Sequence, residues 1–242
     1  MTNKRCWIVA ALIHIAFTIP VCVQIASGQD ASDAQAKIAF VKQSVADNQQ
    51  RLHQYQWIET TQLSLKGEPK PSKQNMCSYG PDGKVQKIPM GDPQAQQQSG
   101  RQGRLKERII QKKTEEMQDY MQQVKALLAL YVPPNPQRIQ QAHQAGNISV
   151  NSTAGSGVVQ LSLKNYAQPG DQMMLFFNTG AMKVQQLSVH TYLNDTKDPV
   201  TLAVQFASLP DGTNYAQQTV MDAPEKKIQV TTTNANYQKV AQ

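Results

Sequence analysis

The fold of this chain is decided by residues 158–240, which include the segments VVQLSLK (158–164) and TLAVQF (201–206). In both segments apolar residues alternate with polar or small ones, and the apolar positions are Val159, Leu161, Leu163, Leu202, Val204 and Phe206. Successive side chains of a β-strand point to opposite faces, so each segment has one apolar face. Repeated along residues 158–240, this pattern predicts an antiparallel sheet with one buried side.

Turn residues divide the rest of the chain into further strands. The Asn178-Thr179-Gly180 and Pro210-Asp211-Gly212 sequences are typical of hairpin turns. We expect strands at 57–65, 74–79, 85–88, 148–152, 158–166, 172–178, 181–193, 200–208, 215–222 and 227–233. Between Val184 and Leu187 the apolar phase slips by one residue, which predicts a β-bulge.

Apolar residues at helical spacing predict three helices. The first runs from Ser32 to about His53, and the second is a long amphipathic helix over 105–131. The third follows Asn135, a capping residue, and ends at Gly146. We expect the long helix to cover the apolar side of the sheet. The predicted fold is therefore α+β, a curved antiparallel β-sheet (half-barrel) with helices packed on its concave face.

The first 28 residues have the pattern of a secretory signal peptide. Lys4 and Arg5 precede an apolar run over 7–23, and Ala26 and Gly28 supply small residues for cleavage. An uncleaved anchor, or lipidation at Cys22, are the alternatives. We expect an exported, periplasmic or extracellular protein with a signal peptide at 1–28 and a single domain at 29–242. Within that domain we expect a flexible loop at 91–103 and a helical insertion at 104–146.

Composition restricts the partners and the chemistry. The net charge of +7 falls by two when Lys4 and Arg5 are removed, and 40% of the residues are hydrophobic, which is enough for a core. The mild basic excess favours an anionic membrane surface over nucleic acid in an exported protein. Cys77 alone remains after cleavage, so we expect a free thiol and a fold without internal disulfides. We expect a monomer.

No catalytic or metal-binding constellation is evident in the sequence. The three histidines of the expected domain, His53, His143 and His190, lie on different predicted elements. The AGSG sequence at 154–157 lacks the glycine that a nucleophile elbow has two residues before its serine, and we interpret it as a turn. We therefore predict no enzyme activity, no cofactor and no metal.

Basic residues gather where the long helix begins, over residues 101–113. One hypothesis is contact with phospholipid head groups or an acidic partner protein. The alternative, which we favour, is a solvated helix face with pairs such as Lys112 and Glu116.

Flexible methionines and inward-facing strand residues indicate where an apolar ligand could be held. Methionine fits irregular apolar shapes, although it is also an ordinary core residue. The candidate cavity residues are Trp57, Met117, Met121, Val124, Leu128, Val159, Leu161, Leu163, Leu187, Val189, Leu202, Val204 and Phe206.

The order of elements and three short motifs resemble the LolA/LolB-like superfamily of lipoprotein-carrier half-barrels. The motifs are LPDGT (209–213), IQV (228–230) and Asn236-Tyr237, and the early strand carries Trp57. The resemblance implies a curved sheet plugged by helices, with no cofactor and no catalysis. It favours a carrier or binding protein for lipid or lipoprotein acyl chains. The alternative is a structural or interaction protein of the cell envelope with a filled core and no ligand.

Overall fold

The computed structural model describes residues 43, 46–91, 104–152, 155 and 157–240, with the side chains of 104–107, 109, 110 and 136 outside the description. Eleven antiparallel strands form one open sheet in the order β4-β3-β1-β11-β10-β9-β8-β7-β6-β5, and β2 pairs with β1. The predicted antiparallel sheet is therefore confirmed. The strands are β1 (Tyr55–Leu65), β2 (Glu68–Pro69), β3 (Lys73–Tyr79), β4 (Val85–Met90), β5 (Ile148–Ser152), β6 (Val158–Lys164), β7 (Gln172–Asn178), β8 (Lys183–Tyr192), β9 (Pro199–Ser208), β10 (Asn214–Ala223) and β11 (Ile228–Lys239).

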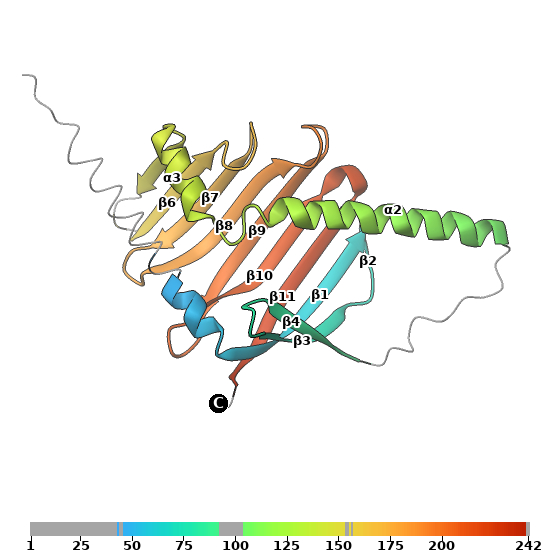
Figure 1. Ribbon diagram of the computed structural model, residues 1–242, viewed down its shortest axis with the longest axis horizontal. Helices are drawn as coiled ribbons and strands as arrows, with labels where there is room; N and C mark the ends of the chain where they lie inside the picture. Colours follow the sequence, from blue (N-terminus) through green and yellow to red (C-terminus); the bar gives the residue numbers. More distant parts are fainter. Residues whose placement is uncertain (1–42, 44–45, 92–103, 153–154, 156, 241–242) are drawn as a thin grey trace, which may run out of the picture.

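The sheet joins the two ends of the described chain. Strand β1 pairs with β11 from Tyr55 opposite Lys239 to Leu65 opposite Ile228. This pairing places the N-terminal meander β1–β4 beside the C-terminal meander β5–β11 in a single layer (Figure 1). Because β11 continues to Lys239, it is longer than the strand predicted at 227–233. Its second half, residues 234–239, is mostly polar without apolar alternation, and its hydrogen bonds to β1 hold it extended.

The predicted β-bulge is confirmed on β8. Phe176 lies opposite Gln186, whereas the next residue, Phe177, lies opposite Val184. Gln185 is therefore the extra residue. The bulge restores the inward direction of the apolar residues that follow it, and Leu187 and Val189 are fully buried.

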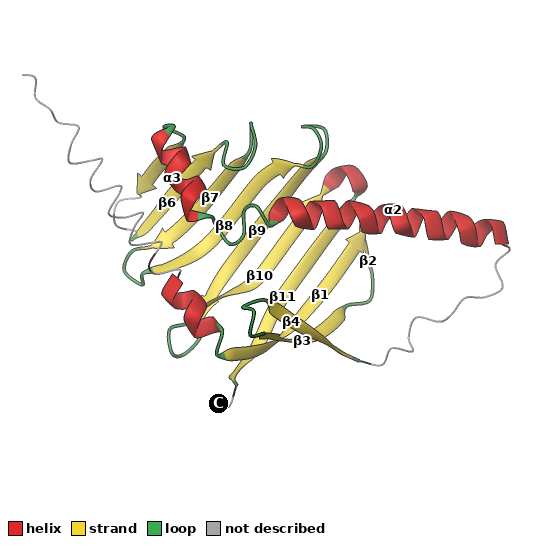
Figure 2. Cartoon of the chain, viewed as in Figure 1, coloured by secondary structure: helices red, strands yellow, loops and turns green. Residues whose placement is uncertain are grey.

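Three helical segments and a short 3₁₀ helix accompany the sheet in the described chain (Figure 2). They are residues 46–52, α2 (Arg104–Leu128), α3 (Pro136–Gln144) and η2 (Pro224–Lys226). Asn135 caps α3 as predicted, because its side-chain oxygen accepts hydrogen bonds from the backbone N–H groups of Gln137 and Arg138. The predicted signal peptide at 1–28, the start of the first predicted helix and residues 92–103 of the predicted loop at 91–103 lie outside the described residues.

The long helix covers less of the sheet than the sequence predicted. It ends at Leu128 rather than at Tyr131, and the side chains of Arg108 and of residues 111–116 are exposed. Among the described side chains of α2, those that join the core lie in its C-terminal half and include Tyr120, Val124 and Leu127. Figure 1 shows the N-terminal part of α2 extending beyond the sheet. The exposed turns contain the polar residues 112–116, four of which are charged, and these interrupt the apolar stripe. Lys112 pairs with Glu116 at 3.9 Å.

The core lies between the C-terminal half of α2, α3 and the inner face of the sheet. Seventeen buried residues form one cluster. Its sheet residues include Leu163, Met173, Leu187, Val189, Val200 and Val204. The alternation in β9 is confirmed for Leu202 and Val204, which are 6% and 2% exposed, whereas Phe206 is only half-buried. Phe206 lies where the core gives way to a pocket.

Candidate functional site

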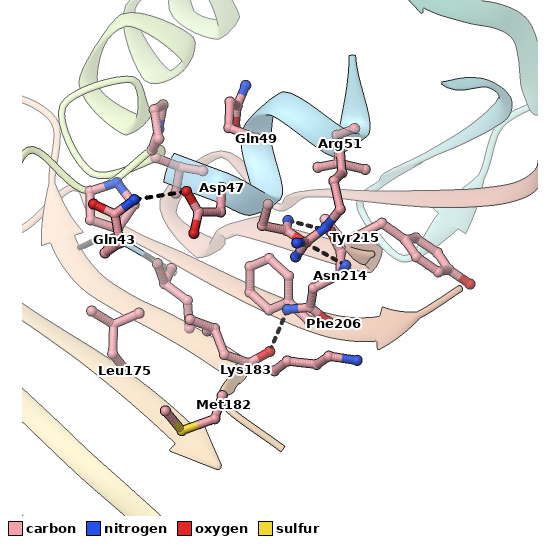
Figure 3. Close-up of a pocket in the computed structure, with 18 of the residues that line it drawn as sticks. Gln43, Asp47, Gln49, Arg51, Leu175, Met182, Lys183, Phe206, Asn214 and Tyr215 are labelled. Carbon is pink, nitrogen blue, oxygen red and sulfur yellow. Dashed lines mark hydrogen bonds between the residues drawn. The ribbon is translucent and has the colours of Figure 1, made fainter. Parts of the chain in front are cut away.

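A pocket of about 800 Å³ opens on the inner face of the sheet. Its walls come from the helical residues 46–52, the segment Val132–Pro134, Ile139 of α3 and side chains from ten strands, all of the described strands except β2. Figure 3 shows the helix over the pocket, with Leu175, Met182 and Phe206 on the opposite wall. Small-molecule sites commonly have volumes of about 300–1,000 Å³ and mostly apolar linings, and this pocket has both properties.

A row of leucines forms the floor of the pocket. Leu161 of β6 lies opposite Leu175 of β7, which lies opposite Leu187 of β8. Residues directly opposite each other in an antiparallel sheet share a face, so the three side chains are neighbours. Leu163 continues this floor along β6. The alternation that buries these strands thus also supplies a continuous aliphatic surface.

Aromatic rings from four neighbouring strands form one end wall. Trp57 of β1 stacks on Tyr237 of β11, with ring centroids 5.4 Å apart and planes 10° apart. Tyr79 of β3 lies 5.4 Å from Trp57, and Tyr215 of β10 lies 4.4 Å from Tyr237. The indole Nε1 of Trp57 donates a hydrogen bond to Asn234 Oδ1 at 3.2 Å. Trp57 is therefore fixed in position at the pocket wall.

The hydroxyls of Tyr79 and Tyr237 in this wall stay protonated at neutral pH. Burial raises the pKa of Tyr237 well above its usual value, and the neighbouring Tyr79 and Tyr215 raise it further. Burial also raises the pKa of Tyr79. Such groups can donate hydrogen bonds to a ligand but are poor bases or nucleophiles at neutral pH.

Paired asparagines hold the helical residues 46–52 against the sheet. Asn48 Nδ2 donates to the backbone oxygen of Asn214 at 2.7 Å, and the backbone N–H of Asn214 donates to Asn48 Oδ1 at 2.6 Å. Asn214 Nδ2 in turn donates to the backbone oxygen of Val184 at 2.7 Å. His53 adds a ring contact with Tyr79 at 4.3 Å. These contacts set the width of the pocket beside β8 and β10.

The sequence-predicted cavity residues divide into two groups. Five of them line the pocket, namely Trp57, Leu161, Leu163, Leu187 and Phe206. The others lie outside its lining: Val124, Val189, Leu202 and Val204 are buried in the core, Met117, Met121 and Leu128 pack partly buried against it, and Val159 is half-buried on β6. The α2 methionines are therefore core residues in this structure.

Most residues of the aromatic wall and of the helical side of the pocket were not predicted from the sequence. Tyr79 and Tyr215 fall at the ends of predicted strands, and Tyr237 lies beyond the predicted end of its strand. No periodicity within one strand reveals that rings from four strands meet. Leu52 and Met182 also line the pocket from outside the strands.

A buried polar network fastens the end of α2 to the sheet. The hydroxyl of Tyr131, which is fully buried, donates to Asp171 Oδ2 at 2.6 Å and lies 2.8 Å from Thr191 Oγ1. Asp171 also accepts hydrogen bonds from the backbone N–H groups of residues 166, 167 and 168. Tyr120 donates to Asp198 Oδ1 at 2.9 Å. This half of α2 is therefore a committed part of the fold.

The described residues contain no cluster of three or more His, Cys, Asp or Glu side chains that could hold a metal ion. Cys77 is fully buried, and burial raises the pKa of its thiol, which makes it unreactive at neutral pH. Within the same ranges, no helix has the length and apolar character to cross a membrane.

Comparison with known proteins gives a distant structural similarity. A scan against protein-family models and a search of curated proteins each gave no match. Among solved structures, the chain is similar to the crystal structure of a DUF1329 family protein from Desulfovibrio piger. The TM-score is 0.39 and the sequence identity 10%, over 85% of this chain and 92% of that chain. A similarity at this level does not indicate a function for this chain.

Proposed function

We propose that this protein is a non-catalytic carrier or binding protein for lipid or lipoprotein acyl chains. The pocket of about 800 Å³ on the inner face of the sheet is the observation that carries the proposal. Its leucine floor and its aromatic end wall offer an apolar surface to a hydrocarbon chain. We infer further that the sheet is a half-barrel whose helices occupy its concave side, because helices and strands together line the pocket.

Burial of hydrocarbon supplies the affinity. Each buried methylene contributes about 0.8 kcal/mol, while association costs on the order of 4–15 kcal/mol. A chain of about ten or more methylenes is therefore needed for useful binding. Affinity should rise roughly fourfold with each added methylene until the pocket is full. This dependence on length distinguishes an acyl site from a site for small polar ligands.

The proposed setting is the cell envelope. The signal-peptide pattern of residues 1–28 favours export, after which the protein would work as a monomer in the periplasm or outside the cell. The mild basic excess of the expected domain favours an anionic membrane surface as a partner. The exposed Arg108, Lys112 and Lys113 of α2 fit a solvated helix face, on which Lys112 pairs with Glu116. Mass spectrometry of lipids that co-purify with the exported protein tests both the setting and the cargo.

A structural or interaction protein of the envelope is the second candidate. It is favoured by the packed part of the inner face, where Tyr120, Val124 and Leu127 share one core cluster with Leu202 and Val204. This candidate predicts that no acyl ligand binds and that no lipid co-purifies. The two candidates therefore differ in a direct binding measurement.

Trp57 provides the readout for that measurement. The chain has two tryptophans, and Trp7 lies in the predicted signal peptide, so the exported protein has Trp57 as its single reporter in the pocket wall. Brominated fatty acids of increasing length should quench its fluorescence at concentrations that fall with chain length. Absence of quenching at every length, together with absence of co-purifying lipid, would refute the carrier proposal.

Two alanine-to-phenylalanine variants give a matched control. Ala216 lines the pocket and lies opposite Phe206, so Ala216→Phe should fill part of the cavity and weaken binding. Ala203 lies between the inward residues Leu202 and Val204 and therefore points to the other face of the sheet. Ala203→Phe should leave binding unchanged.

A further inference from the structure

Two cationic side chains line one rim of the pocket. Arg51 comes from the helical residues 46–52, and Lys183 begins β8. Figure 3 shows Arg51 on the helix side and Lys183 on the strand side, with Asn214 and Phe206 between them in that view. The Asn48 and Asn214 hydrogen bonds hold the two sides together at this rim.

A hydrogen bond connects Lys183 to this rim, and helical spacing places Arg51 beside it. Lys183 Nζ donates to Ser208 Oγ at 2.9 Å, and Ser208 Oγ lies 3.5 Å from Asn214 Oδ1. Arg51 follows Asn48 by three residues, so the two side chains occupy the same face of the helix. The cations therefore belong to one polar rim rather than to separate surfaces.

The neighbouring carboxylates do not neutralise this rim. Asp47 also lines the pocket, and its Oδ1 accepts a hydrogen bond from Gln43 at 2.8 Å. Asp211 is engaged by the hydroxyl of Tyr55 at 2.5 Å and by Lys239 Nζ at 3.4 Å. Within the described chain, Arg51 and Lys183 have no ion-pair partner within 4.0 Å. The lining thus has two positive charges and one negative charge.

The rest of the lining is apolar or uncharged, which makes the pocket amphipathic. Away from the rim, the lining includes the leucine floor, Pro133, Pro134 and Ile139, and it has no charged side chain. A ligand that matches this surface has one hydrocarbon part and one anionic part. A neutral lipid would leave Arg51 and Lys183 without an anionic partner.

We propose that the pocket binds a single-chain amphiphile with an anionic head group, a carboxylate or a phosphate. The acyl chain lies on Leu161, Leu175 and Leu187, and the head group lies between Arg51 and Lys183. This inference rests on the proposed function and adds the charge of the ligand to it. The head group remains near solvent, so its contribution is moderate and depends on salt.

The experiment compares head groups at constant chain length. Brominated fatty acid, the corresponding fatty alcohol and the corresponding lysophosphatidic acid are titrated into the exported protein, which lacks Trp7, with Trp57 fluorescence as the readout. The variants are Arg51→Gln and Lys183→Gln, and Lys164→Gln is the control because Lys164 is exposed on β6 outside the pocket lining. The preference between carboxylate and phosphate identifies which anion the site takes.

We expect each pocket variant to bind the anionic ligands roughly threefold to tenfold more weakly and the alcohol unchanged. Added salt should weaken the binding of the anions alone, and Lys164→Gln should behave as the parent protein. Equal affinity of the parent protein for acid, phosphate and alcohol would overturn the head-group inference and leave the carrier function standing. Absence of binding by all three would overturn both. A thermal melt of each variant excludes unfolding, and the exposed Arg51 provides the test if the Lys183 variant does not fold.

Discussion

Replacement of Tyr131 by phenylalanine tests the role of the buried network at the end of α2. The substitution keeps the ring, which contacts Tyr166 with centroids 5.6 Å apart, and removes only the hydroxyl. That hydroxyl donates to the Asp171 carboxylate at 2.6 Å. A hydrogen bond to a charged group contributes about 1.5–3 kcal/mol. Because Asp171 keeps three backbone donors, we expect a loss of about 2 kcal/mol.

The matched control is Tyr192→Phe. The hydroxyl of Tyr192 donates to the backbone oxygen of Pro169 at 2.8 Å, in the same loop but at an exposed site. Water can replace this bond, so the free energy of unfolding should fall by less than about 1 kcal/mol. Urea denaturation of both variants at neutral pH measures the difference. Equal losses would show that the buried network does not fasten the helix.

The same pair of variants separates a fixed helix from a displaceable lid. Tyr131 is outside the pocket lining, and the C-terminal half of α2, which precedes it, belongs to the core. We therefore expect acyl ligands to quench Trp57 with the same affinity in Tyr131→Phe as in the parent protein. A large change in affinity without a change in the pocket residues would mean that the end of α2 moves when ligand binds.

Three further predictions concern single residues and segments. Phe206→Ala should lower the free energy of unfolding by about 2 kcal/mol, less than the 3–5 kcal/mol typical of a fully buried ring, because Phe206 is half-buried. Gln205→Ala should change it by no more than about 0.5 kcal/mol, and urea melts test both. The hydrogen bond from Tyr55 holds the pKa of Asp211 well below its usual value. The ionised Asp211 therefore stabilises the fold above about pH 4, and this contribution is lost as the pH falls through the lower pKa of the folded state. In denaturation at pH 5 to 2, the free energy of unfolding should decline less for Asp211→Asn than for the parent protein. Amide hydrogens of residues 111–116 should exchange faster than those of residues 120–128 in mass-spectrometric exchange, and equal rates would contradict the division of α2 into exposed and packed halves.

Local patterns in the sequence were sufficient to place most strands. The alternation in Leu202 and Val204 predicted their burial, and the phase slip after Val184 predicted the bulge at Gln185. Asn135 and Gly146 marked the limits of α3. These features depend on backbone geometry and on neighbours two to four residues away, so the sequence alone contains the necessary information.

Tertiary structure decided which of these elements meet. The pairing of β1 with β11 extends a polar segment into a strand, and it brings Trp57, Tyr79, Tyr215 and Tyr237 into one wall. The tertiary structure also leaves the pocket beneath residues 46–52 and packs the C-terminal half of α2 into the core. Periodicity shows that a residue points inward but not which side chains fill the space opposite it. A packed core and a ligand pocket therefore have the same alternating sequence, and only the long-range contacts separate them.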